Sequence, residues 1–158
     1  MNEDTQEALR SLIRDLLGMP KGSVRPADEN QPTEGDNYAI MQVTEMNPQG
    51  WAGESEDAYQ SGIATITLDF MGEESGVYAR NLNIALQSFY AVNILMGLNL
   101  GLLECRQAIN LSAAEIERIK RYRVTLLLSY AFKYDRPDIV NDATGSIDNI
   151  NINLIGEP

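Results

Sequence analysis

The sequence predicts an α+β fold in which an antiparallel β-sheet of four to five strands carries two main helices packed on one face. Two patterns lead to this prediction. Residues 121–134 alternate between apolar and other side chains, which is typical of a strand with one buried face. Residues 4–17 and 78–96 place apolar side chains at helical spacing, and such a stripe needs another element to pack on.

The expected elements follow one another as helix, two strands, helix and three strands. The first helix begins at Asp4, with Glu7 completing a capping box, and ends before Gly18. Residues 18–37 are rich in proline and acids and predict a long exposed connection. The remaining expected elements are strands at 38–46, 61–71, 102–109, 121–134 and 149–154, a helix over 78–96 that is either straight or kinked, and a short helical turn over 112–119.

Size and charge limit the possible functions. The chain has 158 residues, 44% of them hydrophobic, so we expect one domain over 1–158 that buries about 70% of its unfolded surface. Its net charge of −11 disfavours a mainly electrostatic grip on nucleic acid or an anionic membrane. No signal sequence is evident, and the longest apolar stretch, 91–103, is shorter than a bilayer span. We therefore expect a cytosolic protein without a membrane role.

Few side chains suit catalysis. The chain has no histidine and a single thiol, Cys105, which excludes an imidazole base, a disulfide framework and a zinc site of Cys and His ligands. The closest group of carboxylates is Asp135, Asp138, Asp142 and Asp148, whose spacing does not match the EF-hand calcium loop. We expect a protein that is not an enzyme, has no cofactor and no metal, and buries Cys105 as an inert thiol.

Positive charge is concentrated in one short segment. Half of the Lys and Arg residues lie within 118–136, and four of them form a basic cluster of Arg118, Lys120, Arg121 and Arg123. This cluster is either a solvated face or a patch that docks onto the acidic first sixty residues of a neighbouring copy. The second alternative gives a head-to-tail contact between copies.

A second candidate contact lies in an acidic loop that follows residue 47. The loop contains the only tryptophan, Trp51, next to Glu54, Glu56 and Asp57. Trp51 either tucks under the loop or contacts another protein chain, since tryptophan is enriched at protein interfaces. The helix over 78–96 also has a second apolar stripe, so we expect it to be covered on more than one side, by the other helix or by a partner. This stripe consists of Val77, Ile84, Ala91 and Leu95.

Several segments between about residues 5 and 155 carry a resemblance to a known family. They are the N-terminal helix with Leu9, Leu12, Ile13 and Leu17, the segments 25–32, 38–43 and 64–68, Asn81, Leu82 and Leu86, and the strands 124–134 and 147–154. In order and spacing these segments resemble the tail terminator proteins of tailed bacteriophages, in particular the neck-terminator-like branch.

The resemblance implies a virion structural protein that assembles in the host cytoplasm, caps the finished tail tube, stops its polymerisation and joins it to the neck. It also implies a homo-oligomeric ring, usually a hexamer, with tail tube, sheath and head-side connector as partners and no catalytic residues. An acidic lumen would let genomic DNA slide through without specific binding. Two alternatives remain, namely a head-completion, connector or adaptor protein of the same neck region and a small metal-dependent hydrolase that uses the aspartates of 135–148.

Overall fold

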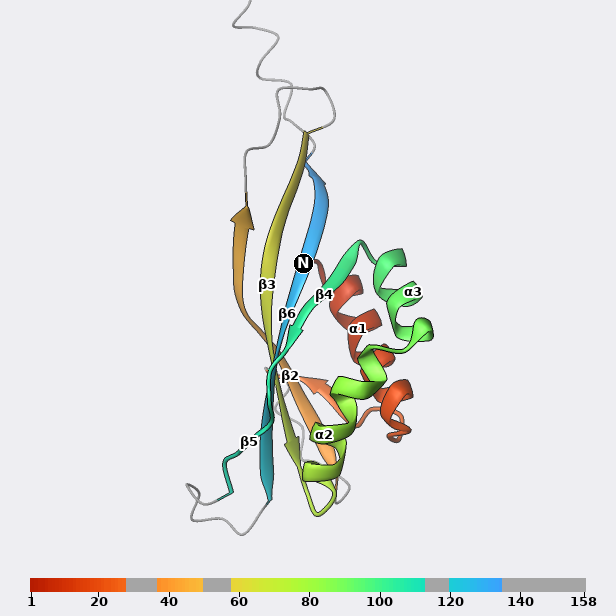
Figure 1. Ribbon diagram of the computed structural model, residues 1–158, viewed down its shortest axis with the longest axis vertical. Coiled ribbons are helices and arrows are strands. Elements are labelled where there is room, and N and C mark those ends of the chain that lie inside the picture. The colour runs from red at the N-terminus through yellow and green to blue at the C-terminus, as the bar shows by residue number, and fades with distance from the viewer. Residues whose placement is uncertain (28–36, 50–57, 113–119, 135–158) are drawn as a thin grey trace, which may run out of the picture.

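The computed structural model describes residues 1–27, 37–49, 58–112 and 120–134, which form three helices and a six-stranded sheet. The helices lie together on one face of the sheet (Figure 1), which confirms the α+β class. The strands are arranged in the order β1-β2-β3-β6-β4, and β5 also pairs with β6. The elements are α1 (Glu3–Leu17), β1 (Val24–Pro26), β2 (Tyr38–Gln49), β3 (Ala58–Met71), α2 (Ser75–Leu86), α3 (Phe89–Gly97), β4 (Leu100–Cys105), β5 (Ile109–Asn110) and β6 (Arg121–Tyr134).

The centre of the sheet is the long antiparallel pair of β3 and β6. The two strands pair without a register shift from Ala58 opposite Tyr134 to Met71 opposite Arg121. The bounds of β6 are those predicted from its alternation of side chains. The ends of β3 and β6 that carry Ala58 and Tyr134 extend beyond the helices (Figure 1).

The core lies between the sheet and the helices. Because side chains alternate across a strand, every second residue from Gly62 to Phe70 of β3 and from Val124 to Tyr130 of β6 is buried. The helices contribute their apolar stripes to the same cluster. The buried residues include Leu9, Leu12 and Ile13 of α1, Leu82 and Leu86 of α2, Ala91 and Leu95 of α3, Ile66, Leu68 and Phe70 of β3, and Val124, Leu126 and Leu128 of β6.

The prediction of an exposed connection over 18–37 is wrong for its first part. Strand β1 pairs in parallel with β2, with Val24 opposite Ala39, and the backbone N–H of Ala39 donates to the carbonyl of Ser23 at 2.8 Å. Met19 and Val24 are buried. The sheet is therefore mixed rather than wholly antiparallel, and it has six strands among the described residues rather than four to five. A strand of three residues is too short for its periodicity to be seen in the sequence.

Three further predictions need correction. The helix expected over 78–96 is two helices, because the Ser88 side chain accepts a hydrogen bond from the backbone N–H of Ala91 and starts α3 anew. The strand expected over 102–109 is split into β4 and β5. The first helix is capped by Asn2, whose side chain accepts from the N–H of Thr5, and not by Asp4. The helical turn beyond Ser112 and the last strand lie outside the described residues.

None of the described helices combines the length and the hydropathy that crossing a lipid bilayer requires.

Candidate assembly interfaces

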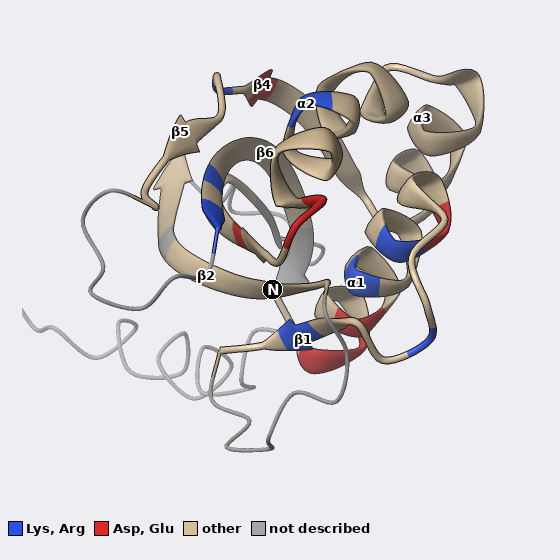
Figure 2. Ribbon diagram, turned by 90° about the horizontal axis from the view of Figure 1, so that it is seen from below, with Lys and Arg blue, Asp and Glu red and all other residues tan. Residues whose placement is uncertain are grey.

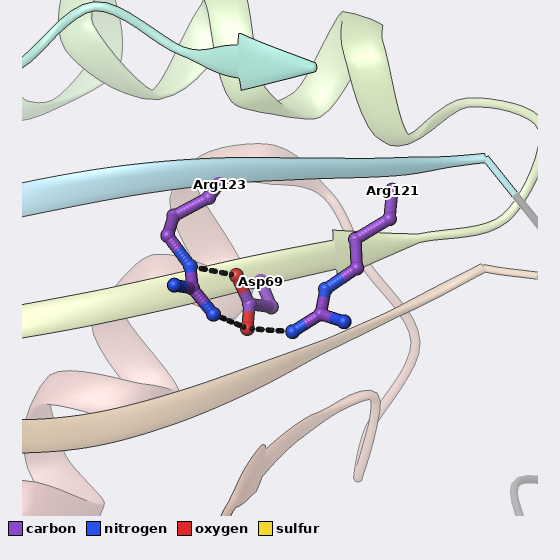
Figure 3. Close-up of polar contacts among 3 residues, drawn as sticks. All are labelled: Asp69, Arg121 and Arg123. Atoms are coloured by element: carbon purple, nitrogen blue, oxygen red, sulfur yellow. Dashed lines mark hydrogen bonds and ion pairs between the residues drawn. The ribbon is translucent and has the colours of Figure 1, made fainter. Parts of the chain in front are cut away.

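The face of the sheet opposite the helices carries an ion-paired cluster. Asp69 on β3 lies directly opposite Arg123 on β6, and Arg121 lies two residues away on the same face. The three side chains converge (Figure 3). Arg123 donates from Nε to Oδ1 of Asp69 at 2.7 Å and from Nη2 to Oδ2 at 2.8 Å, while Arg121 donates from Nη2 to Oδ2 at 2.8 Å. One carboxylate therefore accepts three charge-assisted hydrogen bonds, which are stronger than neutral ones.

The electrostatics of this cluster follow from its burial. The side chain of Asp69 is 12% exposed. Burial alone would raise the pKa of Asp69, but the hydrogen bonds from Arg123 and Arg121 and the attraction of their charges lower it below its ordinary value. The hydrogen bond to Asp69 raises the pKa of Arg123. Two arginines thus share one carboxylate.

The cluster predicted from the sequence is therefore partly neutralised within its own subunit. Lys120 also has an intramolecular partner, since its ammonium group bonds to the carboxylate of Glu73, although both side chains are exposed. That hydrogen bond raises the pKa of Lys120. The remaining member, Arg118, lies outside the described residues. Sequence reasoning found the two arginines but missed Asp69, because its position opposite Arg123 depends on the pairing of two strands far apart in the chain.

The acidic loop residues Trp51, Glu54, Glu56 and Asp57 also lie outside the described residues. The strand ends that flank them are described. Ala58 begins β3, and Arg121 pairs with Met71 at the other end of the same strand. Since β3 has 14 residues, these two ends lie roughly 40 Å apart at about 3.3 Å per residue. The basic residues and the start of β3 are thus at opposite ends of the sheet.

Cys105 lies half-buried at the end of β4. Burial raises the pKa of its thiol, and the charge of Glu104 raises it further. The reactive thiolate form is therefore disfavoured. The aspartates over 135–148 lie outside the described part of the chain, and within that part no group of three or more His, Cys, Asp or Glu side chains is placed to hold a metal ion.

A different surface, the α3 patch, is formed by exposed apolar side chains. It consists of Phe89, Tyr90, Val92 and Met96 of α3 together with Ile84 of α2, which are 82%, 54%, 39%, 67% and 74% exposed. Phe89, Val92 and Met96 follow helical spacing on the side of α3 away from the buried Ala91 and Leu95. The apolar stripe predicted from the sequence is thus divided, because Ala91 and Leu95 are in the core whereas Val77 and Ile84 are exposed.

The α3 patch lies in a region without charge. Residues 81–103 contain no Asp, Glu, Lys or Arg, although 22% of the chain is charged. In Figure 2, α3 is tan along its whole length. Depletion of charge with exposed aromatic and methionine side chains is typical of the centre of a protein interface. The described surface therefore has a face suited to burial against another chain.

An apolar groove lies beside the C-terminal end of α3. It has a volume of about 670 Å³, and none of the residues that line it has a charged side chain. Its apolar lining comes from the residue before α1, the far end of β2, the turn after α3, the start of β4, and β6. These residues are Met1, Met46, Pro48, Leu98, Leu100 and Tyr130. Tyr130 lies close over β3 because Gly62 has no Cβ, which would otherwise stand 2.6 Å from the carbonyl oxygen of Asn47 and against the tyrosine ring.

Comparison with known proteins identifies the family. A chain in the solved virion of a native gene transfer agent particle is similar to this one, with a TM-score of 0.49 and 15% sequence identity over 82% of this chain and 92% of that chain. No curated protein matches the sequence. The family model of phage neck terminator proteins matches residues 4–157, which confirms the resemblance found in the sequence. The chain therefore belongs to the phage neck terminator protein family and has a structural role in the neck or tail of a phage particle.

Proposed function

We propose that this protein caps the finished tail tube, stops its polymerisation and joins it to the head-side connector, as a homo-oligomeric ring that is a hexamer. The observation that carries the proposal is the match of the neck terminator family over residues 4–157, which is almost the whole chain. The protein acts as one domain over 1–158, without catalysis, cofactor, metal or membrane partner. It assembles in the host cytoplasm and remains in the virion, next to the tube and, in a sheathed tail, the sheath.

The acidic composition supports the passage of DNA through such a ring. With a net charge of −11 per subunit, a ring of this protein as a whole repels the phosphates of DNA. The genome then slides through without specific binding. The positive charges of Arg121 and Arg123 do not contradict this, because Asp69 engages both of them.

We also propose that opposite charges help neighbouring subunits to associate. The basic cluster of one copy meets the acidic loop of the next, with Trp51 as an apolar anchor among Glu54, Glu56 and Asp57. The distance of roughly 40 Å between the two ends of β3 supports a contact between copies rather than within one.

The test is polymerisation of purified tail-tube protein with and without the terminator, followed by electron microscopy. We expect shorter tubes with a ring at one end. Tubes that elongate unchanged, or binding to the head-side connector without binding to tube ends, would contradict the capping function.

The charge contact is tested by reversing two residues in the same assay. Arg118→Glu with Lys120→Glu leaves the pairing of Asp69 intact, whereas reversal of Arg121 and Arg123 would also disturb the fold. We expect the double variant to assemble less well, most clearly at low ionic strength where screening is least. Assembly equal to wild type at every salt concentration would contradict a contact between copies through Arg118 and Lys120.

A further inference from the structure

We propose that the α3 patch of one copy packs into the apolar groove of the next copy, with Phe89 entering the groove between Met46 and Tyr130. This contact rests on the proposed ring and specifies two of its complementary surfaces. It is separate from the charged contact, because neither surface has a charged side chain.

The composition of α3 requires a cover on its outer side. Its nine residues are apolar apart from one asparagine and a glycine, and a helix that is apolar all round is normally buried all round. Within the chain only Ala91 and Leu95 of α3 are fully packed in the described structure. Phe89 and Tyr90 alone expose roughly 250 Å² if an aromatic side chain contributes about 150 to 250 Å².

With Ile84, Val92 and Met96, the patch reaches on the order of 500 Å². This is at the upper end of the largest apolar patch that a monomer normally exposes. It is also more than half of the roughly 800 Å² that each partner buries in a stable interface. The patch is therefore large enough to form the centre of a subunit contact.

Charge indicates that the occupant of the groove is a second copy. Two copies that each carry a net charge of −11 repel one another, and a contact between two surfaces without acidic side chains brings no carboxylates together. The same chain presents a projection without charged side chains and a groove whose lining has no acidic side chain, although the N-terminal ammonium group of Met1 lies there and donates to Sδ of Met46 at 3.1 Å. The groove, at about 670 Å³, is as large as pockets of roughly 300 to 1,000 Å³ that enclose small-molecule ligands. It has room for Phe89 and part of a neighbouring side chain.

Phe89 does not enter the groove of its own chain. Both surfaces depend on α3, since Phe89 is its first residue and Leu98, which lines the groove, follows its last. A helix of nine residues keeps these ends about 13 Å apart. A patch on one copy that fills a groove on the next is a heterologous contact, which generates a closed ring when the rotation between copies closes.

Cross-linking of two single-cysteine variants tests the pairing directly. On a Cys105→Ala background, Asn93→Cys places a thiol in the patch beside Phe89, and Thr5→Cys places one at the groove. With a short bismaleimide, we expect cross-linked dimers when the two variants are mixed and none from either variant alone. Cross-linking of Asn93→Cys with itself would show that two patches face each other. Either that result or the absence of a mixed product overturns the proposal.

Substitution of the patch tests its contribution. We expect Phe89→Ser with Met96→Ser to weaken assembly at least about tenfold while the thermal unfolding of the dilute subunit is unchanged. The control is Ile109→Ser on β5, because Ile109 is 57% exposed but lies outside the patch. If the double variant assembles like the control, or unfolds at a clearly lower temperature as a monomer, the inference is wrong.

The mass of the wild-type assembly separates this inference from the proposed function. If the wild type forms a ring and the double variant forms the same ring, the proposed contact is wrong but the proposed ring stands. If the wild-type protein stays monomeric in solution and at tube ends, both the proposed contact and the proposed ring are wrong.

Discussion

Replacing Asp69 by Asn should destabilise the subunit by about 2 kcal/mol at neutral pH. The change keeps the size of the side chain but removes the charge that engages Arg121 and Arg123. Loss of one partner from a fully buried ion pair costs about 3 to 5 kcal/mol, whereas exposed pairs contribute about 0 to 1 kcal/mol. Asp69 is 12% exposed, but Arg121 and Arg123 are 23% and 40% exposed, so the expected loss lies between these limits.

The same variant should lose its effect in acid. Because the pKa of Asp69 is lowered in the folded state, its contribution to stability is complete above the pKa of the unfolded chain. It is lost as the pH falls through the lower, folded-state pKa, since the carboxylate is then protonated in both states. The difference between wild type and Asp69→Asn should therefore be largest near pH 7 and should shrink below about pH 4.

Urea unfolding followed by circular dichroism at several pH values measures this difference. The matched control is Glu104→Gln, because Glu104 is 51% exposed and lies 3.4 Å from Arg106, so we expect a change below about 0.5 kcal/mol. A loss for Asp69→Asn as small as that of the control, or one that does not change with pH, would refute the assigned role of the carboxylate.

Three other predictions concern the core, a close contact and the acidic loop. Leu126→Ala should cost about 2 to 5 kcal/mol in denaturant unfolding, because Leu126 is fully buried under the helices, and a loss below about 1 kcal/mol would contradict this. Gly62→Ala should cost about 1 to 3 kcal/mol, since its Cβ would collide with Tyr130 and with backbone, and an unchanged midpoint would show that the strands can move apart. The fluorescence of Trp51 should shift to the blue on assembly, and Trp51→Ala should reduce assembly without unfolding the subunit. A spectrum already blue in the monomer, with large destabilisation by the substitution, would instead make Trp51 a core residue.

The elements that could be predicted are those with a periodic pattern of apolar side chains over a long stretch. Strand β6 has alternating apolar side chains over 14 residues, and its bounds follow from that alternation. Helix α1 has an apolar stripe and ends at Gly18, which adopts the left-handed conformation with φ of 63° that favours glycine. Local periodicity is sufficient in both cases, because burial of one face dictates the pattern.

The features that could not be predicted depend on pairing between distant segments. Strand β1 is held by β2, and its three residues carry no period of their own. The ion pair of Asp69 depends on the register of β3 against β6, and a shift of one residue would move Asp69 to the other face. Alternation along each strand puts Asp69 and Arg123 on the face opposite the helices, but only the register of β3 against β6 brings them together.

The division of the stripe predicted over 77–95 has the same origin and a consequence for assembly. Positions 77, 84, 91 and 95 share one side of a continuous helix, but α2 ends at Leu86 and Ser88 starts α3 in a new direction. Residues of α2 and α3 therefore no longer share one side of a common helix axis. Ala91 and Leu95 turn into the core, whereas Ile84 of α2 and Phe89 at the start of α3 are both exposed. A single break in the helix thus directs part of an apolar stripe away from its own sheet, which leaves a surface that a neighbouring subunit can bury.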